Sequence, residues 1–151
     1  MKTITTTLLA IMATISVAFA ATLYIDNNDR PIKYDELPAK AKSFISTHFA
    51  SEEVSHIILD KDIVDNDYTV SFLSGTKLEF DGKGEWKEVD CNKTSVPEAL
   101  IPQQIAEYVK TSYPHNVITE IKREHGNTEI KLNGGLELTF NNRYRVVDID
   151  D

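Results

Sequence analysis

Hydrophobic and polar residues alternate between residues 68 and 89, and glycine-containing turns interrupt this alternation twice. Residues 68–72 and 77–80 carry an apolar side chain at every second position. The first turn contains Gly75, and the second contains Gly82 and Gly84. Period-two alternation between glycine turns predicts short antiparallel strands with one buried and one solvated face. The same pattern returns between residues 128 and 149, so a second set of strands is predicted there.

A helical pattern precedes each set of strands. In the first pattern, apolar residues recur at the spacing of one helix face, namely at Leu37, Ala41, Phe44, Ile45 and Phe49. Asp35 and Glu36 supply negative charge at the expected N-terminus of this helix, and Pro38 suits a first helical turn. We therefore expect a helix that packs its apolar stripe against the sheet.

The helix and its strands recur along the chain. An offset of 64 residues pairs helix positions of the same chemical type: Leu37 with Ile101, Pro38 with Pro102, Ala41 with Ile105, Phe44 with Tyr108, Ile45 with Val109 and Phe49 with Tyr113. On the strands the offset is 60, and it pairs Gly75 with Gly135 and Phe80 with Phe140. Such self-similarity predicts an α+β fold of two tandem helix-plus-four-strand repeats, which form one antiparallel sheet of about eight strands with the helices on one face.

The pattern divides the chain into five segments. Residues 1–20 have a positive start at Lys2, a short apolar run and an A-x-A end, which predicts a secretory signal peptide cleaved after Ala20 or Ala21. Residues 21–34 form an extended lead-in, 35–91 the first repeat, 92–95 a connector and 96–151 the second repeat. The protein is therefore expected to be periplasmic or secreted, with no membrane association after cleavage.

Charge and cysteine content narrow the classes of function. The formal net charge is −8, and an acidic surface disfavours binding to nucleic acid. The single cysteine, Cys91, follows a predicted strand, where a half-buried structural thiol is the ordinary interpretation and a catalytic nucleophile is the alternative. One cysteine cannot form an internal disulfide, so apolar burial has to stabilise the fold.

Several stretches of the chain resemble a known family of exported bacterial proteins. They are LPAKAKSFISTHF at 37–49, YTVSFLSGTKLEFDGKGEWKEVDC at 68–91, VPEALIPQQIAEYVKTSYP at 96–114 and EIKLNGGLELTFNNRYRVVDID at 129–150. Together they are similar to the PepSY-like, beta-lactamase-inhibitor-protein-like family. The resemblance implies tandem helix-plus-four-strand repeats, a binding or inhibitory role and no established catalytic residues. Residues 141–144 depart from it, because the second repeat lacks the glycine turn of the first.

The solvated face of the predicted sheet is the candidate binding surface. Alternation places Thr69, Ser71, Lys77, Glu79, Glu129, Lys131, Glu137 and Thr139 there. If alternation continues, Trp86 joins them, and Tyr144 is a further candidate; if a bulge follows Gly84, Trp86 instead points into the core. Aromatic residues among mixed charges are typical of protein-binding surfaces. The predicted partner is a protein or peptide, and the contacts assigned to it are Lys77, Glu79, Trp86, Lys131, Glu137 and Tyr144.

The sequence lacks the common motifs of enzymes and metal-binding proteins. His48, His56, His115 and His125 do not have the spacing of metal ligands, and the sequence has no nucleophile elbow or phosphate-binding loop. We therefore predict a protein that is not an enzyme and that needs no cofactor or metal. The alternative is a sensor of a small ligand or divalent cation that uses acidic loops, chiefly the one that contains Asp60, Asp62, Asp65 and Asp67.

Overall fold

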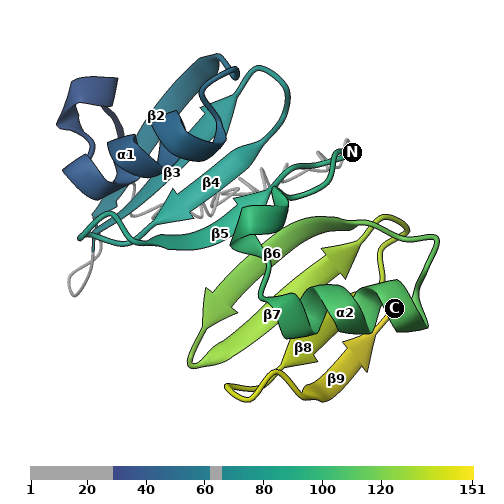
Figure 1. Cartoon of the computed structure of the whole chain (residues 1–151). Helices are drawn as coiled ribbons and strands as arrows, with labels where there is room; N and C mark the ends of the chain where they lie inside the picture. Colours follow the sequence, from purple (N-terminus) through teal and green to yellow (C-terminus); the bar gives the residue numbers. More distant parts are fainter. Residues whose placement is uncertain (1–28, 62–65) are drawn as a thin grey trace, which may run out of the picture.

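The chain folds into one sheet and two α-helices (Figure 1). The computed structural model describes residues 29–61 and 66–151, so the predicted signal peptide and most of the lead-in lie outside the described residues. The strands are β1 (Arg30–Pro31), β2 (Val54–Lys61), β3 (Asn66–Phe72), β4 (Lys77–Phe80), β5 (Trp86–Asp90), β6 (Ile118–Glu124), β7 (Asn127–Leu132), β8 (Glu137–Phe140) and β9 (Val146–Asp150). The helices are α1 (Ala39–His48) and α2 (Gln103–Ser112), with short 3-10 helices at Tyr34–Glu36 and Glu98–Leu100.

All nine strands belong to a single open antiparallel sheet in the order of the sequence, from β1 to β9. Helix α1 precedes β2–β5, and α2 precedes β6–β9. We call these the first and second units. They are joined edge to edge through β5 and β6, where Val89 lies opposite Ile121. The predicted α+β class with one antiparallel sheet is therefore confirmed, and β1 adds a ninth strand to the eight that were expected.

One row of apolar side chains crosses the sheet from β2 to β9. Residues that lie directly opposite one another in antiparallel strands share a face of the sheet. The pairing register connects Ile57, Val70, Leu78, Val89, Ile121, Ile130, Leu138 and Ile149 in this way. Six members of the row, from Val70 to Leu138, are at most 1% exposed. The row defines the buried face of the sheet.

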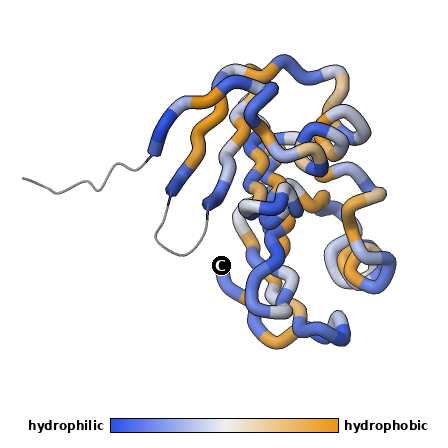
Figure 2. The backbone as a smooth tube through the Cα atoms, turned by 90° about the vertical axis from the view of Figure 1, so that its left-hand side faces the viewer, coloured by the Kyte–Doolittle hydropathy of each residue, from blue (hydrophilic) through white to orange (hydrophobic). Residues whose placement is uncertain are grey.

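Both helices pack on this buried face. The ring of Phe44 in α1 meets Phe80 edge to face at 5.6 Å, and Tyr108 in α2 meets Phe140 in the same manner at 5.5 Å. Figure 2 shows the two helices on the same side of the sheet, and hydrophobic residues recur along its strands. Burying such side chains contributes about 1.5–3 kcal/mol each, which offsets the low intrinsic stability of ten-residue helices.

The start of α1 differs from the prediction. Asp35 and Glu36 belong to the separate 3-10 helix, so they do not lie in the first turn of α1. Pro38 is the N-cap residue and has an extended backbone, with ψ at 145°. A residue that precedes proline is driven out of the helical region, and Leu37 accordingly has ψ at 147°. The proline therefore separates the two helices.

The turn at residues 141–145 also differs from what its sequence suggested. In the β4–β5 turn, the Asp81 carboxylate accepts hydrogen bonds from the amides of Lys83 and Glu85. In the β8–β9 turn, Asn141 accepts the equivalent bonds from the amides of Arg143 and Arg145. Gly84 has φ at +81°, and Tyr144 takes the same left-handed region with φ at +55°. The second turn therefore keeps the geometry of the first without its glycine.

Candidate functional site

The face of the sheet opposite the helices is polar, and we call it the open face. The four strand residues predicted to bind a partner lie on it, because Lys77 pairs with Ser71 and Asp90, Glu79 with Thr69 and Glu88, and Lys131 with Glu137. Within 29–61 and 66–151, both α-helices lie on the other face. The open face is therefore a pleated surface of strand side chains.

Charged side chains on the open face are ordered in two rows that cross the sheet. One row runs through Lys77, Asp90, Glu120, Lys131, Glu137 and Asp150, and the other through Glu79, Glu88, Lys122, Glu129 and Asp148. The rows contain eight carboxylates and three lysines. Their excess of negative charge exerts a field that attracts cationic groups and repels anionic ones.

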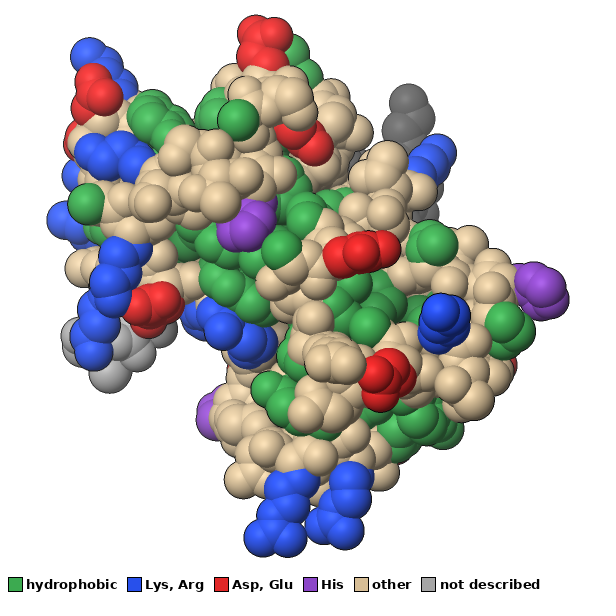
Figure 3. Space-filling view, viewed as in Figure 1, with side chains coloured by type: hydrophobic (Ala, Val, Ile, Leu, Met, Phe, Trp, Pro, Cys, Tyr) green, Lys and Arg blue, Asp and Glu red, His purple; other side chains and the backbone are tan. Residues whose placement is uncertain are grey.

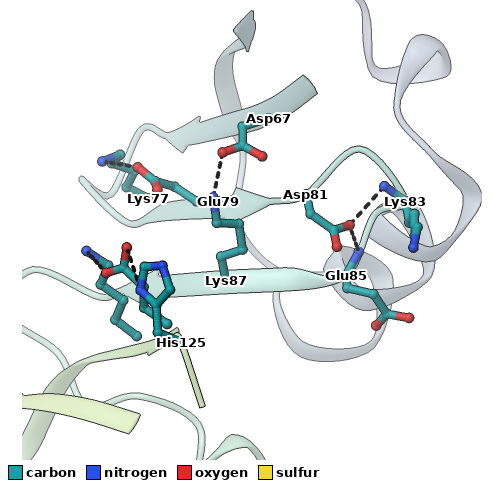
Figure 4. A network of polar contacts seen from close by, with 10 residues as sticks. Asp67, Lys77, Glu79, Asp81, Lys83, Glu85, Lys87 and His125 are labelled. Carbon is teal, nitrogen blue, oxygen red and sulfur yellow. Dashed lines mark hydrogen bonds and ion pairs between the residues drawn. The ribbon is translucent and has the colours of Figure 1, made fainter. Parts of the chain in front are cut away.

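The lysines of the open face pair with neighbouring carboxylates. Lys77 Nζ lies 2.7 Å from Glu79, and Lys131 Nζ lies 2.6 Å from Glu137. Lys87 pairs with Asp67 at 2.5 Å on the same face (Figure 4). The hydrogen bonds that Lys77 donates to Glu79 and Lys131 donates to Glu137 raise the pKa of both lysines. Exposed pairs of this kind contribute about 0–1 kcal/mol each, so they order the surface more than they stabilise the fold.

Two carboxylates at the junction of β5 and β6 are less solvated than the rest. Burial raises the pKa of Glu88, and the neighbouring charge of Glu79 raises it further. Burial likewise raises the pKa of Glu120, with further contributions from Glu88 and Asp90. The centre of the open face thus contains carboxylates that would gain from a cationic neighbour.

A shallow hollow of about 400 Å³ adjoins this centre. Its lining includes Asp90, Lys93, Glu120, Lys131 and Asn133. The charges of the lining are mixed, and the hollow is open to solvent. It extends the open face toward the β7–β8 turn.

Trp86 does not lie on the open face; the structure has the second of the two alternatives, a bulge that turns its side chain toward the core. The register shifts between β4 and β5, with Glu79 opposite Glu88 but Phe80 opposite Trp86. Lys87 is the extra residue of this bulge, and the bulge reverses the expected orientation of Trp86. The indole consequently packs on the helix side, 6.1 Å from the ring of Phe44.

Arg123 holds Trp86 in place, and the sequence reasoning did not identify it. The guanidinium carbon lies 3.5 Å from the centre of the indole ring, and Nη2 donates a hydrogen bond of 2.6 Å to the Trp86 carbonyl oxygen. The contact joins β6 to β5 and so ties the second unit to the first. Figure 3 shows the hydrophobic surface between the helices on this side of the molecule. The alternation of β6, with Arg123 two residues after the buried Ile121, was the available signal.

Tyr144 lies in the β8–β9 turn, outside the two charged rows. Its side chain is 37% exposed. Tyr144 acts electrostatically on Arg123, whose side chain lies on the helix side. Burial lowers the pKa of Arg123, and the interaction with Tyr144 acts in the opposite direction and raises it. The structure therefore does not group Tyr144 with Lys77, Glu79, Lys131 and Glu137.

The chemistry of the thiol disfavours a nucleophilic role. Cys91 is 4% exposed, and burial raises the pKa of its thiol to about 11. The reactive thiolate is therefore scarce at neutral pH. Among the described residues, no group of three or more histidine, cysteine or acidic side chains is arranged to hold a metal ion.

Only part of the acidic loop is described. Asp62 and Asp65 lie outside the described residues. Asp60 lies opposite Asp67 in the β2–β3 pair, and Asp67 is engaged by Lys87. Asp67 thus has a cationic neighbour in the sheet.

Comparisons with known proteins identify the family. Residues 66–148 match the family described as "Putative beta-lactamase-inhibitor-like, PepSY-like". No curated protein matches the chain. Solved structures match it closely along nearly their whole length.

Three of these structures come from Bacteroides. A "putative periplasmic protein" of the DUF2874 family from B. vulgatus is 41% identical, with a TM-score of 0.79 over 83% of this chain and 98% of that one. A "putative calcium-regulated periplasmic protein" from B. thetaiotaomicron is 40% identical, with a TM-score of 0.80 over 83% and 99%. A second B. vulgatus "putative periplasmic protein of unknown function" is 34% identical, with a TM-score of 0.78 over 82% and 99%.

The location of the relatives agrees with the sequence. Each of the three is described as periplasmic, as expected from the predicted export signal. In the part of the chain that the structure describes, no helix has the length and apolar character needed to cross a membrane. The protein is accordingly periplasmic or secreted, and the chain belongs to the PepSY-like, beta-lactamase-inhibitor-like family.

Proposed function

We propose that the protein is an exported, non-enzymatic binding module that contacts a protein or peptide through the open face of its sheet. The observation that carries the proposal is the pair of charged rows on a face that no described helix covers. Ordered, partly desolvated charges on a rigid sheet favour selective contacts with a complementary surface. The contacts proposed on this face are Lys77, Glu79, Lys131 and Glu137.

The two units are proposed to descend from one duplicated helix-plus-four-strand repeat. The matching offsets of 64 and 60 residues in the sequence support this origin. It also accounts for the width of the open face, since two copies side by side double the surface available to a partner.

The experiment compares capture of partners from a periplasmic extract by the wild-type protein and a charge-reversed variant. The variant Glu79→Lys with Glu137→Lys changes the open face, and Glu53→Lys with Glu107→Lys makes the same charge change elsewhere. We expect the open-face variant to lose its partners and the control to retain them. Retention of every partner by the open-face variant would refute this surface.

An inhibitory role is a narrower form of the proposal, and the family description supports it. Its test is the activity of a β-lactamase with and without an excess of the protein. A decrease that the open-face variant abolishes supports inhibition. Unchanged β-lactamase activity at saturating protein would exclude this enzyme class as the partner. The capture experiment would then still test for other partners.

The second candidate function is a sensor of a divalent cation. The observation in its favour is that the 40% identical B. thetaiotaomicron protein is described as calcium-regulated. The acidic loop with Asp60, Asp62, Asp65 and Asp67 would then supply the oxygen ligands that calcium prefers. Calorimetric titration with calcium tests this candidate, and a titration without heat from the wild-type protein would eliminate it.

A further inference from the structure

The outer edge of strand β9 pairs with no described strand, whereas the equivalent edge of β5 pairs with β6. Both strands pair with the strand before them in the same register. Leu78 lies opposite Val89, and Leu138 lies opposite Ile149. Each pair of strands also has a bulge, beyond which Trp86 lies opposite Phe80 and Val146 lies opposite Phe140. The two edges are therefore geometrically comparable.

The outer edge of β5 is covered by β6. Val89 lies opposite Ile121, Glu88 opposite Lys122 and Asp90 opposite Glu120. This pairing leaves Val89 with no exposed surface. The neighbouring strand thus places an apolar residue opposite Val89 and a cation opposite Glu88, while Asp90 faces a second carboxylate, whose pKa is raised by burial and by this charge.

The outer edge of β9 has no such neighbour among the described strands, because β9 pairs with β8 alone. Ile149 is 52% exposed and Val147 is 56% exposed. Asp148 and Asp150 flank Ile149 on the open-face side. An edge strand with exposed apolar residues is a ready template for a further strand.

We propose that β9 binds an extended peptide segment that adds to the sheet as a tenth, antiparallel strand. The segment has an apolar residue opposite Ile149 and a basic residue opposite each of Asp148 and Asp150. The pairing of β5 with β6 supplies the geometry, and the two aspartates supply the charge complementarity.

A second copy of this chain is a poor occupant of the edge. If two β9 strands met antiparallel with Ile149 opposite its own copy, Asp148 of each would face Asp150 of the other. Like charges directly opposite one another destabilise a strand pair. The β1 edge is also unsuitable, because Pro31 has no amide hydrogen to donate. The charges of the edge therefore favour a basic partner over self-association.

The test uses a short capped peptide that alternates lysine and isoleucine, with a glutamate and isoleucine peptide as the charge control. Binding is measured by fluorescence anisotropy, and amide hydrogen exchange locates it. We expect the basic peptide to bind and to slow exchange of the β9 amides, while the acidic peptide does not. The variant Asp148→Lys should weaken binding about threefold to tenfold, since it turns an attractive cross-strand pair into a repulsive one.

The matched control is Glu53→Lys, which makes the same change in net charge far from the edge and should bind like the wild type. Protection confined to β3, β4 and β7 would assign the peptide to the open face and refute strand addition while supporting the proposed function. Equal binding by Asp148→Lys, an absence of binding, or concentration-dependent dimers with protected β9 amides would also overturn the inference.

Discussion

The β4–β5 and β8–β9 turns have the same hydrogen bonds but different residues at the left-handed position. In the first unit the residue is Gly84, and a Cβ there would lie 2.7 Å from Cβ of Pro38 and 3.0 Å from the amide nitrogen of Ala41. In the second unit the residue is Tyr144, whose side chain is 37% exposed. Glycine is therefore required in the first turn by the close approach of α1, and not by the turn itself.

The largest effect expected from this difference is that of Gly84→Ala. Alanine would have to adopt an unfavourable backbone conformation at this position, and its methyl group would collide with the start of α1. These two costs together should lower the free energy of unfolding by about 3 kcal/mol or more. Urea denaturation measures the loss.

Gly126→Ala is the matched control for this substitution. Gly126 also has a positive φ, at +82°, but a Cβ there would meet no atom within 4 Å. The control should lose only about 1–2 kcal/mol from backbone strain. Equal losses at the two positions would show that the approach of α1 does not require Gly84.

The next largest effect is a difference in stability cost between substitutions in the two strands that follow these turns. Trp86 and Val146 both lie opposite a buried phenylalanine, but only Trp86 is held by Arg123. Trp86→Ala should cost about 2–3 kcal/mol because the indole is partly buried and makes a cation–π contact. Val146→Ala should cost about 1 kcal/mol or less, since a half-buried valine loses little surface. Thermal unfolding of both variants checks the ranking, and a smaller loss for Trp86→Ala would contradict it.

A smaller effect, of opposite sign, is expected at Tyr144. Glycine adopts the left-handed region without the steric cost that tyrosine bears. Tyr144→Gly should therefore raise the free energy of unfolding by about 0.5–1 kcal/mol. Chemical denaturation beside Gly84→Ala provides the comparison. A loss of stability would mean that the Tyr144 side chain makes contacts that outweigh its backbone strain.

The smallest effect concerns the pH dependence at the junction of the two units. Burial raises the pKa of Glu88 above its ordinary value of 4.5. Between that value and the raised one, the folded state binds more protons than the unfolded state, so stability falls as pH rises. Glu88→Gln should therefore be more stable than the wild type at pH 7 and should lose this advantage as the pH falls to 4.5.

Denaturant unfolding at several pH values tests this expectation. Asp148→Asn, at the comparable position of β9, is the control, because no described strand covers that edge. Its effect on the free energy of unfolding at pH 7 should be smaller. A stabilisation by Glu88→Gln that grows as the pH falls would contradict the sign derived from burial.

Sequence alone located the two faces of the sheet because period-two alternation depends only on neighbouring residues. This is why Val70, Leu78, Lys77 and Glu79 were placed correctly. The bulge at Lys87 depends on which residue of β4 lies opposite, so alternation alone left Trp86 open between the solvated face and the core.

The hydrophobic pattern of the sequence could not predict contacts between elements that are distant along the chain. The stacking of Arg123 on Trp86 requires β6 to lie beside β5, which no local signal specifies. Likewise, the need for Gly84 comes from α1, more than thirty residues earlier in the sequence. The left-handed conformation of Tyr144 was hidden because tyrosine is not typical of that region.

The proline in β1 has a consequence for how copies of this protein behave at high concentration. Filaments in which the sheets of successive subunits pair edge to edge need a free strand edge at both ends of every subunit. Here Pro31 caps one end of the described sheet with a residue that cannot donate a ladder hydrogen bond. Growth that began at the opposite end would meet this weakened edge, so the proline disfavours polymerisation into fibres.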